Sequence, residues 1–156
     1  MEGPVRKATL AEIRANVGKE IGVSEWMTIT QAMINQFADL TNDHYFIHVN
    51  PERAKQETPF GGSIAHGFLT MSMLAAMAYQ AVPRMVEAKM GVNYGFDRLR
   101  FIAPVPAGSR VRGRFVLKSV EDKGGGKWAV THSVTVEIDG GAKPAIQADW
   151  MGMTFV

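Results

Sequence analysis

The sequence contains no cysteine among its 156 residues. This absence excludes disulfide bonds, zinc sites built from thiolates and catalysis by a thiol. The chain also lacks a strong excess of one charge, and its formal net charge of +2 does not indicate nucleic-acid binding. Basic residues near the amino terminus are followed by no apolar run, so we predict no signal peptide. We expect a cytoplasmic globular protein with one domain over 1–156.

Acidic and basic residues are absent from the stretch 61–82, around which the rest of the chain is organised. It opens with Gly61-Gly62-Ser63, ends before Pro83, and carries apolar residues on nearly every helical face. The hydroxyl of Ser63 can cap the first turn, so we predict one long helix, buried on all sides. A stretch of this length could cross a bilayer. However, polar residues interrupt it and no basic flank or aromatic belt borders it, so we predict no membrane span.

The pattern of apolar residues predicts mostly helices before this stretch and strands after it. The predicted elements before it are a short helix after the capping box of Thr9 and Glu12, a strand over 21–29, a helix from Thr28 or Thr30 to about 42, and a short helix over 51–56.

Four predicted strands follow Pro83, over 90–102, 110–121, 128–138 and 145–155, and we expect them to form an antiparallel meander. An apolar helix followed by a meander indicates an α+β fold in which a curved sheet wraps around the helix. One sheet covers only one side of such a helix, so we predict a homodimer in which a partner subunit covers the rest.

Asp43 and His48 stand five positions apart in the loop-rich region 42–62. A loop allows both side chains to face one point, while the apolar residues between them anchor the backbone. A carboxylate beside an imidazole can hold one water molecule and move its protons, which is general acid–base chemistry. The alternative is structural, with Asp43 capping a turn or the helix at Pro51 and His48 merely exposed.

His44 and His48 have the spacing of two metal ligands on one helix face, with Asp43, Asp39 or His66 as a possible third ligand. The surrounding Asn42, Asn50 and Pro51 argue against a helix at this point. We therefore expect no metal, and a structural or solvent-exposed role for His44.

Gly67 follows His66 in the first turn of the predicted long helix, where backbone N–H groups lack partners within the helix. A glycine lets a ligand carbonyl approach these groups, as in an oxyanion hole. The alternative is that Gly67 permits close packing of helix and sheet. Ser72 is either a packed hydroxyl bonded to a backbone carbonyl or a support for the dyad.

Basic residues alternate along the strand 110–121. We interpret the row of Arg110, Arg112, Arg114 and Lys118 as a solvated face, with phosphate as its natural ligand if it is a site. His132 lies between Val130 and Val134, which favours a packed histidine over a catalyst.

Taken together, these motifs resemble the MaoC-like dehydratase family of (R)-specific enoyl-CoA hydratases. The motifs are Asp43-His44-Tyr45-Phe46-Ile47-His48 with the following Val49-Asn50-Pro51, then Ser63-Ile64-Ala65-His66-Gly67-Phe68-Leu69, the segment 93–101 and the turn 104–109. The resemblance covers about 18–156. Many members have Asn-Pro where this chain has Tyr45-Phe46, and a subgroup that resembles nodulation protein N has Gln-Trp there. These two residues could alter the acyl pocket.

The resemblance implies a hotdog fold and reversible syn hydration of a trans-2-enoyl thioester to an (R)-3-hydroxyacyl thioester. Asp43 and His48 would hold the water, and the Gly67 N–H would bind the thioester oxygen. The substrate would be an acyl-CoA or acyl-carrier-protein thioester, with no metal or organic cofactor. The residues expected to contact it are Tyr45, Phe46, Ile64, His66, Ser72, Arg98 and Arg100. The phosphates of CoA would lie outside the pocket, and we predict that their contacts are among five arginines: Arg98, Arg100, Arg110, Arg112 and Arg114. A hotdog thioesterase and a non-catalytic acyl-CoA-binding protein are the alternatives.

Overall fold

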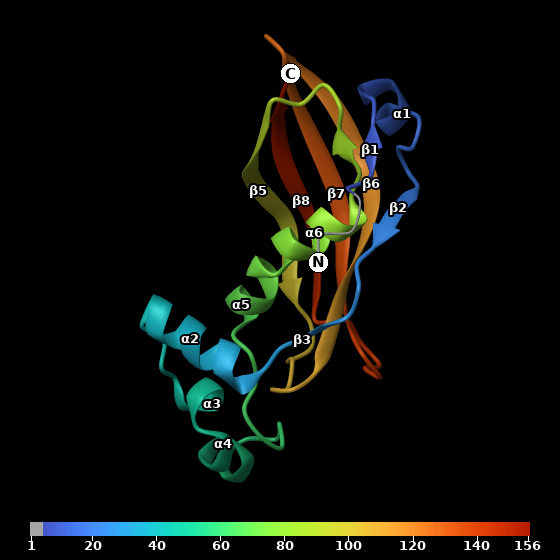
Figure 1. Ribbon diagram of the computed structural model, residues 1–156. Coiled ribbons are helices and arrows are strands. Elements are labelled where there is room, and N and C mark those ends of the chain that lie inside the picture. Colours follow the sequence, from blue (N-terminus) through green and yellow to red (C-terminus); the bar gives the residue numbers. More distant parts are fainter. Residues whose placement is uncertain (1–4) are drawn as a thin grey trace.

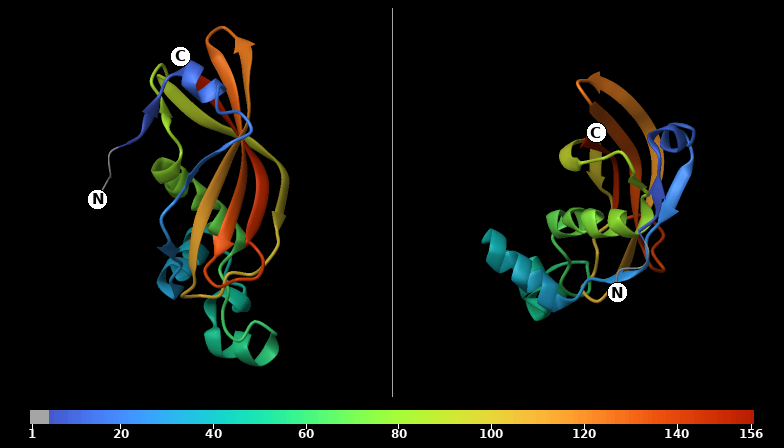
Figure 2. Two further views of the ribbon diagram at one scale, coloured as in Figure 1. Left: turned by 90° about the vertical axis from the view of Figure 1, so that its right-hand side faces the viewer. Right: turned by 45° about the horizontal axis from the view of Figure 1, so that its top comes forward.

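The computed structural model describes residues 5–156 and consists of a curved antiparallel sheet with two consecutive helices against its concave side (Figure 1, Figure 2). Within these residues the sheet has six strands. They are β2 (Glu20–Val23), β3 (Met27–Thr28), β5 (Met90–Phe101), β6 (Arg110–Gly124), β7 (Lys127–Ile138) and β8 (Ile146–Phe155). The expected α+β class, with a sheet curved around a helix, is confirmed.

The order of the strands differs from the predicted meander. β5 pairs with β8, from Met90 opposite Phe155 to Phe101 opposite Ile146, and not with β6, which follows it in the chain. β6 instead lies between β2 and β7, so the order is β2-β6-β7-β8-β5. The prediction of a simple meander was therefore wrong, because alternation identifies strands but carries no information on which strands pair. The segment 102–109 must cross from one side of the sheet to the other.

The predicted long helix is divided into α5 (Gly67–Ser72) and α6 (Leu74–Ala81), joined at Met73. Its N-cap is His66 and not Ser63. The chain before Gly67 is held extended, because the Ile64 N–H donates to the Ile47 carbonyl and the Ala65 N–H to the Val105 carbonyl. These contacts come from distant segments, so the local sequence pattern placed the helix start too early.

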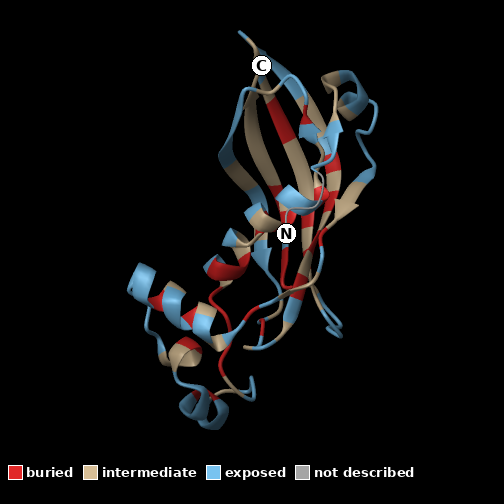
Figure 3. Ribbon diagram, in the orientation of Figure 1, coloured by how far each residue is buried: buried red, intermediate tan, exposed pale blue. Residues whose placement is uncertain are grey.

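The helix pair is buried on one side only. Leu69, Leu74 and Met77 are buried, whereas the side chains of Phe68 and Tyr79 are 61% and 82% exposed. The sheet of the single chain thus covers one side of the helices, as expected, and burial of the other side by a partner subunit stays a prediction. Figure 3 shows exposed segments, in pale blue, along the helix pair.

The sheet approaches α6 very closely at two glycines. A Cβ at Gly22 would lie 2.0 Å from the Ala81 carbonyl oxygen, and one at Gly113 would lie 3.1 Å from the Met77 Cβ. Gly113 belongs to the predicted inward row of β6, whose other members Val111, Phe115 and Leu117 are fully buried. The alternation predicted for this strand is confirmed.

Three helices lie together beyond one end of the sheet: α2 (Gln31–Thr41), α3 (Phe46–Val49) and α4 (Pro51–Glu57) (Figure 1). The Thr30 hydroxyl caps α2, as predicted, and Pro51 begins α4. Helix α3 was not predicted, because its 4 residues are too few to show a helical pattern of apolar side chains.

The remaining elements lie near the amino terminus. α1 (Leu10–Arg14) begins with the expected capping box of Thr9 and Glu12. The short strands β1 (Lys7–Ala8) and β4 (Arg84–Met85) pair in parallel and were not predicted. Among residues 5–156, no helix is long and apolar enough to cross a membrane.

Candidate active site

The end of α2 places Asp43. Asn42 closes this helix in the left-handed conformation (φ 58°), which turns the chain sharply. The Asp43 N–H donates to the Ala38 carbonyl at 3.1 Å, so the backbone of this residue is still tied to the helix. Its carboxylate is about half exposed, at 52%, and Oδ1 is 3.4 Å from the Tyr45 backbone nitrogen.

His48 is carried by α3 and is buried at 9% exposure. Its Nδ1 lies 2.7 Å from the Ile64 carbonyl oxygen, an acceptor, so Nδ1 carries a proton and donates. The neutral ring therefore has its lone pair on Nε2. Burial lowers the pKa of His48, as does His66, while the hydrogen bond to Ile64 and the charge of Asp43 offset this only partly.

Gln31 and Ser63 hold the backbone of His48. The Gln31 Nε2 donates to the His48 carbonyl oxygen at 2.8 Å, and the Ser63 hydroxyl donates to the Gln31 Oε1. Ser63 is buried. Sequence reasoning missed Gln31 and interpreted Ser63 as a helix cap. Both belong to elements far from His48 in the chain, so no local signal could have identified them.

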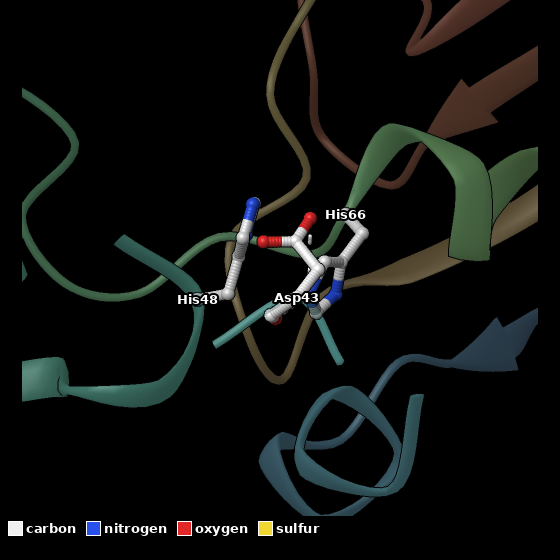
Figure 4. Close-up of side chains that lie close together, drawn as sticks. All are labelled: Asp43, His48 and His66. Carbon is white, nitrogen blue, oxygen red and sulfur yellow. Dashed lines mark hydrogen bonds and ion pairs between the residues drawn. The ribbon is translucent and has the colours of Figure 1, made fainter. Parts of the chain in front are cut away.

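His66 is almost completely buried, at 2% exposure, and lies against both members of the dyad (Figure 4). Its Nε2 is 3.0 Å from the backbone carbonyl oxygen of Asp43 and 3.9 Å from the Oδ2 of the same residue. Its ring stacks on that of His48, with 3.9 Å between centroids and 25° between planes.

These side chains face a pocket of about 420 Å³ at the amino-terminal end of α5. Asp43, His48, His66 and Gly67 all line it, together with part of the crossing segment 102–109. The remaining lining residues are mostly apolar, and they include Ile64, Phe68, Thr70, Phe101, Ala145 and Ile146. A carboxylate, a neutral imidazole and the first backbone N–H groups of a helix thus meet in one largely apolar cavity.

A family model described as a MaoC-like domain matches residues 12–138. The chain belongs to the MaoC-like dehydratase family. It is 51% identical over 147 residues to nodulation protein N of Rhizobium leguminosarum bv. viciae, covering 94% of this chain and 91% of that one. It is 48% identical over 141 residues to 3-hydroxyacyl-thioester dehydratase Z of Mycobacterium tuberculosis, covering 90% of this chain and 92% of that one.

A solved structure has the same hotdog fold. It is described as a monoamine oxidase regulatory protein from Archaeoglobus fulgius and superposes with a TM-score of 0.81 at 25% identity, over 96% of this chain and 95% of that chain. The family and the fold expected from the sequence motifs are therefore confirmed.

Several residues implied by the family resemblance do not line the pocket of this MaoC-like chain. Tyr45 is 59% exposed and meets the edge of Phe46, whose ring lies 4.0 Å below the Arg53 guanidinium. The Ser72 hydroxyl is exposed and donates to the Phe68 carbonyl oxygen. Their assignment to the substrate has no support from the pocket, whereas Ile64 and His66 do line it.

The arrangement does not suit a metal ion. Asp43, His48 and His66 bring possible ligand atoms within 4.8 Å of one another. However, a ring nitrogen binds a metal through a lone pair in the plane of its ring, and the two stacked rings have nearly parallel planes. Planes tilted by 25° with centroids 3.9 Å apart meet well away from the rings, beyond the length of a metal–nitrogen bond, about 2 Å. His44, the other candidate ligand, lies outside this group, with its Nε2 at 2.8 Å from Asp39 Oδ1.

Most of the basic residues considered for phosphate binding already contact carboxylates. Arg110 pairs with Asp139, Arg112 with Glu137, and Arg114 with Glu20 and Glu137, whereas Arg98 and Lys118 pair with Asp149. Burial raises the pKa of Asp149, but hydrogen bonds from Lys118, Arg98 and Ser133 outweigh it and hold this pKa at about 2. Arg100 is exposed, and its Nη1 donates to the Leu99 carbonyl oxygen. Within residues 5–156, it is the one member of the five candidate arginines without a carboxylate partner.

A second pocket of about 220 Å³ lies at the other end of the helix pair, beside the end of α6. Ala78, Val82 and Leu117 are among its mostly apolar lining residues, and His132 is also part of its wall. Burial lowers the pKa of His132 to about 4. Its ring meets Phe115 edge-on, at 6.4 Å between centroids.

Proposed function

We propose that this protein hydrates trans-2-enoyl thioesters to 3-hydroxyacyl thioesters, and dehydrates them in the reverse direction. The observation that carries this proposal is that Asp43 and His48 face one pocket, with the unprotonated Nε2 of His48 available to a water molecule. The relative described as a 3-hydroxyacyl-thioester dehydratase adds support, because it matches this chain over nearly its whole length.

In the proposed mechanism, one water molecule donates hydrogen bonds to the Asp43 carboxylate and to the His48 Nε2. The water oxygen attacks C3 of the substrate while His48 accepts a proton from it. The electron pair of the C2–C3 double bond moves toward the thioester, whose oxygen gains negative charge as an enolate. C2 then takes the proton from the His48 Nε2, which restores both groups. Because water and proton come from the same side, the addition is syn.

The backbone N–H of Gly67 is the donor proposed for the thioester oxygen. Gly67 is the first residue of α5 and lines the pocket beside the dyad. An N–H at this position has no acceptor within its own helix. A donor aimed at the place where charge develops stabilises the transition state more than the ground state. No metal or organic cofactor takes part in these steps.

The substrate carrier is proposed to be CoA or an acyl-carrier protein, with its phosphates outside the pocket. Arg100 is the proposed phosphate contact among the five arginines, because the other four already contact carboxylates. A guanidinium group suits phosphate because it offers several donors in one plane.

The protein is also proposed to act as a homodimer that joins along β5. This strand forms an edge of the sheet and exposes Met90, Val92 and Tyr94 at 53%, 47% and 67%. An edge strand with exposed apolar side chains favours pairing with a second chain. We expect light scattering at micromolar concentration to give twice the monomer mass, and a monomeric mass would contradict the proposal.

The activity is tested directly with crotonyl-CoA, whose enoyl absorbance falls on hydration. We expect turnover by the wild-type protein and a loss of at least about a hundredfold in kcat for Asp43→Asn, which keeps the shape but removes the charge. His44→Gln is the matched control, because this neighbouring side chain lies outside the pocket. No hydration of crotonyl-CoA or of longer enoyl thioesters would contradict the proposed function.

A further inference from the structure

His66 is part of the pocket wall, but most of its ring faces other residues of the protein and not the cavity. Its ring is enclosed by three elements: the Asp43 backbone after α2, His48 of α3, and Phe37 of α2, whose ring centroid lies at 5.0 Å. With 2% of its surface exposed, the side chain has little area left for a ligand. Its hydrogen bond goes to the backbone of Asp43, and one face of its ring stacks on His48. These are the two residues proposed to hold the water.

The tautomer of His66 follows from its contacts. Nε2 lies 3.0 Å from the Asp43 carbonyl oxygen, which only accepts hydrogen bonds, so the ring proton is on Nε2. Nδ1 is buried and has no hydrogen-bond partner in the described part of the chain. A proton on Nδ1 would therefore be a buried donor without an acceptor, which is costly.

We propose that His66 is a positioning residue that sets the distance between Asp43 and His48. This inference rests on the proposed hydration activity. The Nε2–H fixes the backbone of Asp43, and the stacked face of the ring supports the imidazole of His48. The two groups proposed to hold the water come from different elements, and the side chain of His66, the N-cap residue of α5, thereby holds them at one spacing. A misplacement of about 1 Å in such a pair can cost on the order of a hundredfold in rate.

Separate variants remove the two contacts. His66→Gln keeps a donor near the position of Nε2 but loses the stacked ring, His66→Phe keeps a ring but loses the donor, and His66→Ala loses both. We expect kcat to fall by about tenfold for Gln and for Phe and by about a hundredfold for Ala, with KM nearly unchanged. A rise in KM at constant kcat would assign His66 to substrate binding and overturn the proposal.

The pH profile provides a readout that a merely structural role would not change. The titratable groups in contact with the ring are Asp43 and His48, and Phe37 is apolar. Burial is the main cause that lowers the pKa of His48, and the neighbouring His66 lowers it further, so replacing His66 by Phe, which keeps the burial, should move the acid limb of kcat/KM to higher pH. An unmoved limb, with kcat within about twofold of wild type, would overturn the proposal.

Nuclear magnetic resonance separates this inference from the proposed activity. In wild-type protein the nitrogen shifts of His66 should show a proton on Nε2, and a ring protonated on Nδ1 alone would overturn the proposal even if every variant fails to fold. The His48 titration should move upward in His66→Phe whether or not enoyl thioesters are the substrate. A moved titration without any hydration would contradict the proposed function and leave the positioning role supported.

Discussion

The two ends of the helix pair α5–α6 each have a pocket lined by a histidine, but the surroundings of the buried His48 differ from those of the half-buried His132. At the amino-terminal end, His48 donates to the Ile64 carbonyl and faces the pocket beside the Asp43 carboxylate. At the carboxyl-terminal end, His132 lies in a mostly apolar wall, and burial alone lowers its pKa. Burial shifts both histidines in the same direction, so a lowered pKa does not identify a catalyst. The distinguishing features are the oriented tautomer and the adjacent carboxylate.

The strongest test of this comparison replaces each histidine. We expect His48→Ala to lower kcat with enoyl-CoA by about a hundredfold or more, whereas His132→Leu should stay within about threefold of wild type. Steady-state kinetics at neutral pH measures both, and circular dichroism checks that the variants are folded. Equal losses in the two variants would contradict the assignment of the catalytic role to His48.

The stability of the protein in acid is a second way to compare the two ends, and here the effect is expected from His132. The native pKa of His132 is about 4, whereas the unfolded chain has the usual value of about 6.5. The unfolded state therefore binds more protons as the pH falls below about 6.5, and stability is lost toward pH 4.

When the pH falls from 7 to 5, the unfolding free energy of the wild-type protein should fall by about 2 kcal/mol because of His132. We expect His132→Leu to be less sensitive to acid by that amount, as measured by urea unfolding at equal protein concentration. If the variant loses as much stability as wild type between these pH values, the histidine does not titrate as its burial requires.

Access to the backbone N–H of Gly67, the proposed donor at the amino-terminal end, is tested by Gly67→Ala. A Cβ at this position would lie 2.8 Å from the Phe101 ring, which must then shift in the pocket wall. The displaced ring should disturb the position of a bound thioester beside the Gly67 N–H, so we expect kcat/KM to fall by about tenfold. The double variant with Phe101→Leu should recover most of the activity, and a failure to recover would show that the contact with Phe101 is not the cause.

The smallest effect is expected at the arginines outside the pocket. Arg100→Gln should raise KM for crotonyl-CoA by about threefold and leave kcat unchanged, because the contact serves binding. Arg110→Gln is the control, since Arg110 already pairs with Asp139. A pantetheine thioester without the nucleotide should not distinguish the variants. If both thioesters are affected equally, Arg100 does not contact the CoA phosphates.

The sequence was sufficient to predict the elements of the fold whose signals are local. The alternation of Val111, Phe115 and Leu117, the capping box of Thr9 and Glu12, and the Thr30 cap all appear in the structure. The alternation of side chains along a strand and the hydrogen bonds of a helix cap involve residues only a few positions apart, so both can be recognised in the sequence. The motifs around Asp43 and His66 were also sufficient to indicate the family.

Contacts between distant segments decided the rest. The pairing of β5 with β8, the start of the helix at Gly67 and the engagement of four arginines by carboxylates all depend on partners that no local pattern specifies. The same holds within the site. The sequence by itself determined that a carboxylate is present at Asp43 and imidazoles at His48 and His66. Only the tertiary structure decided that His66 lies beneath His48 and holds Asp43, because hydrogen bonds and ring stacking depend on distances in space.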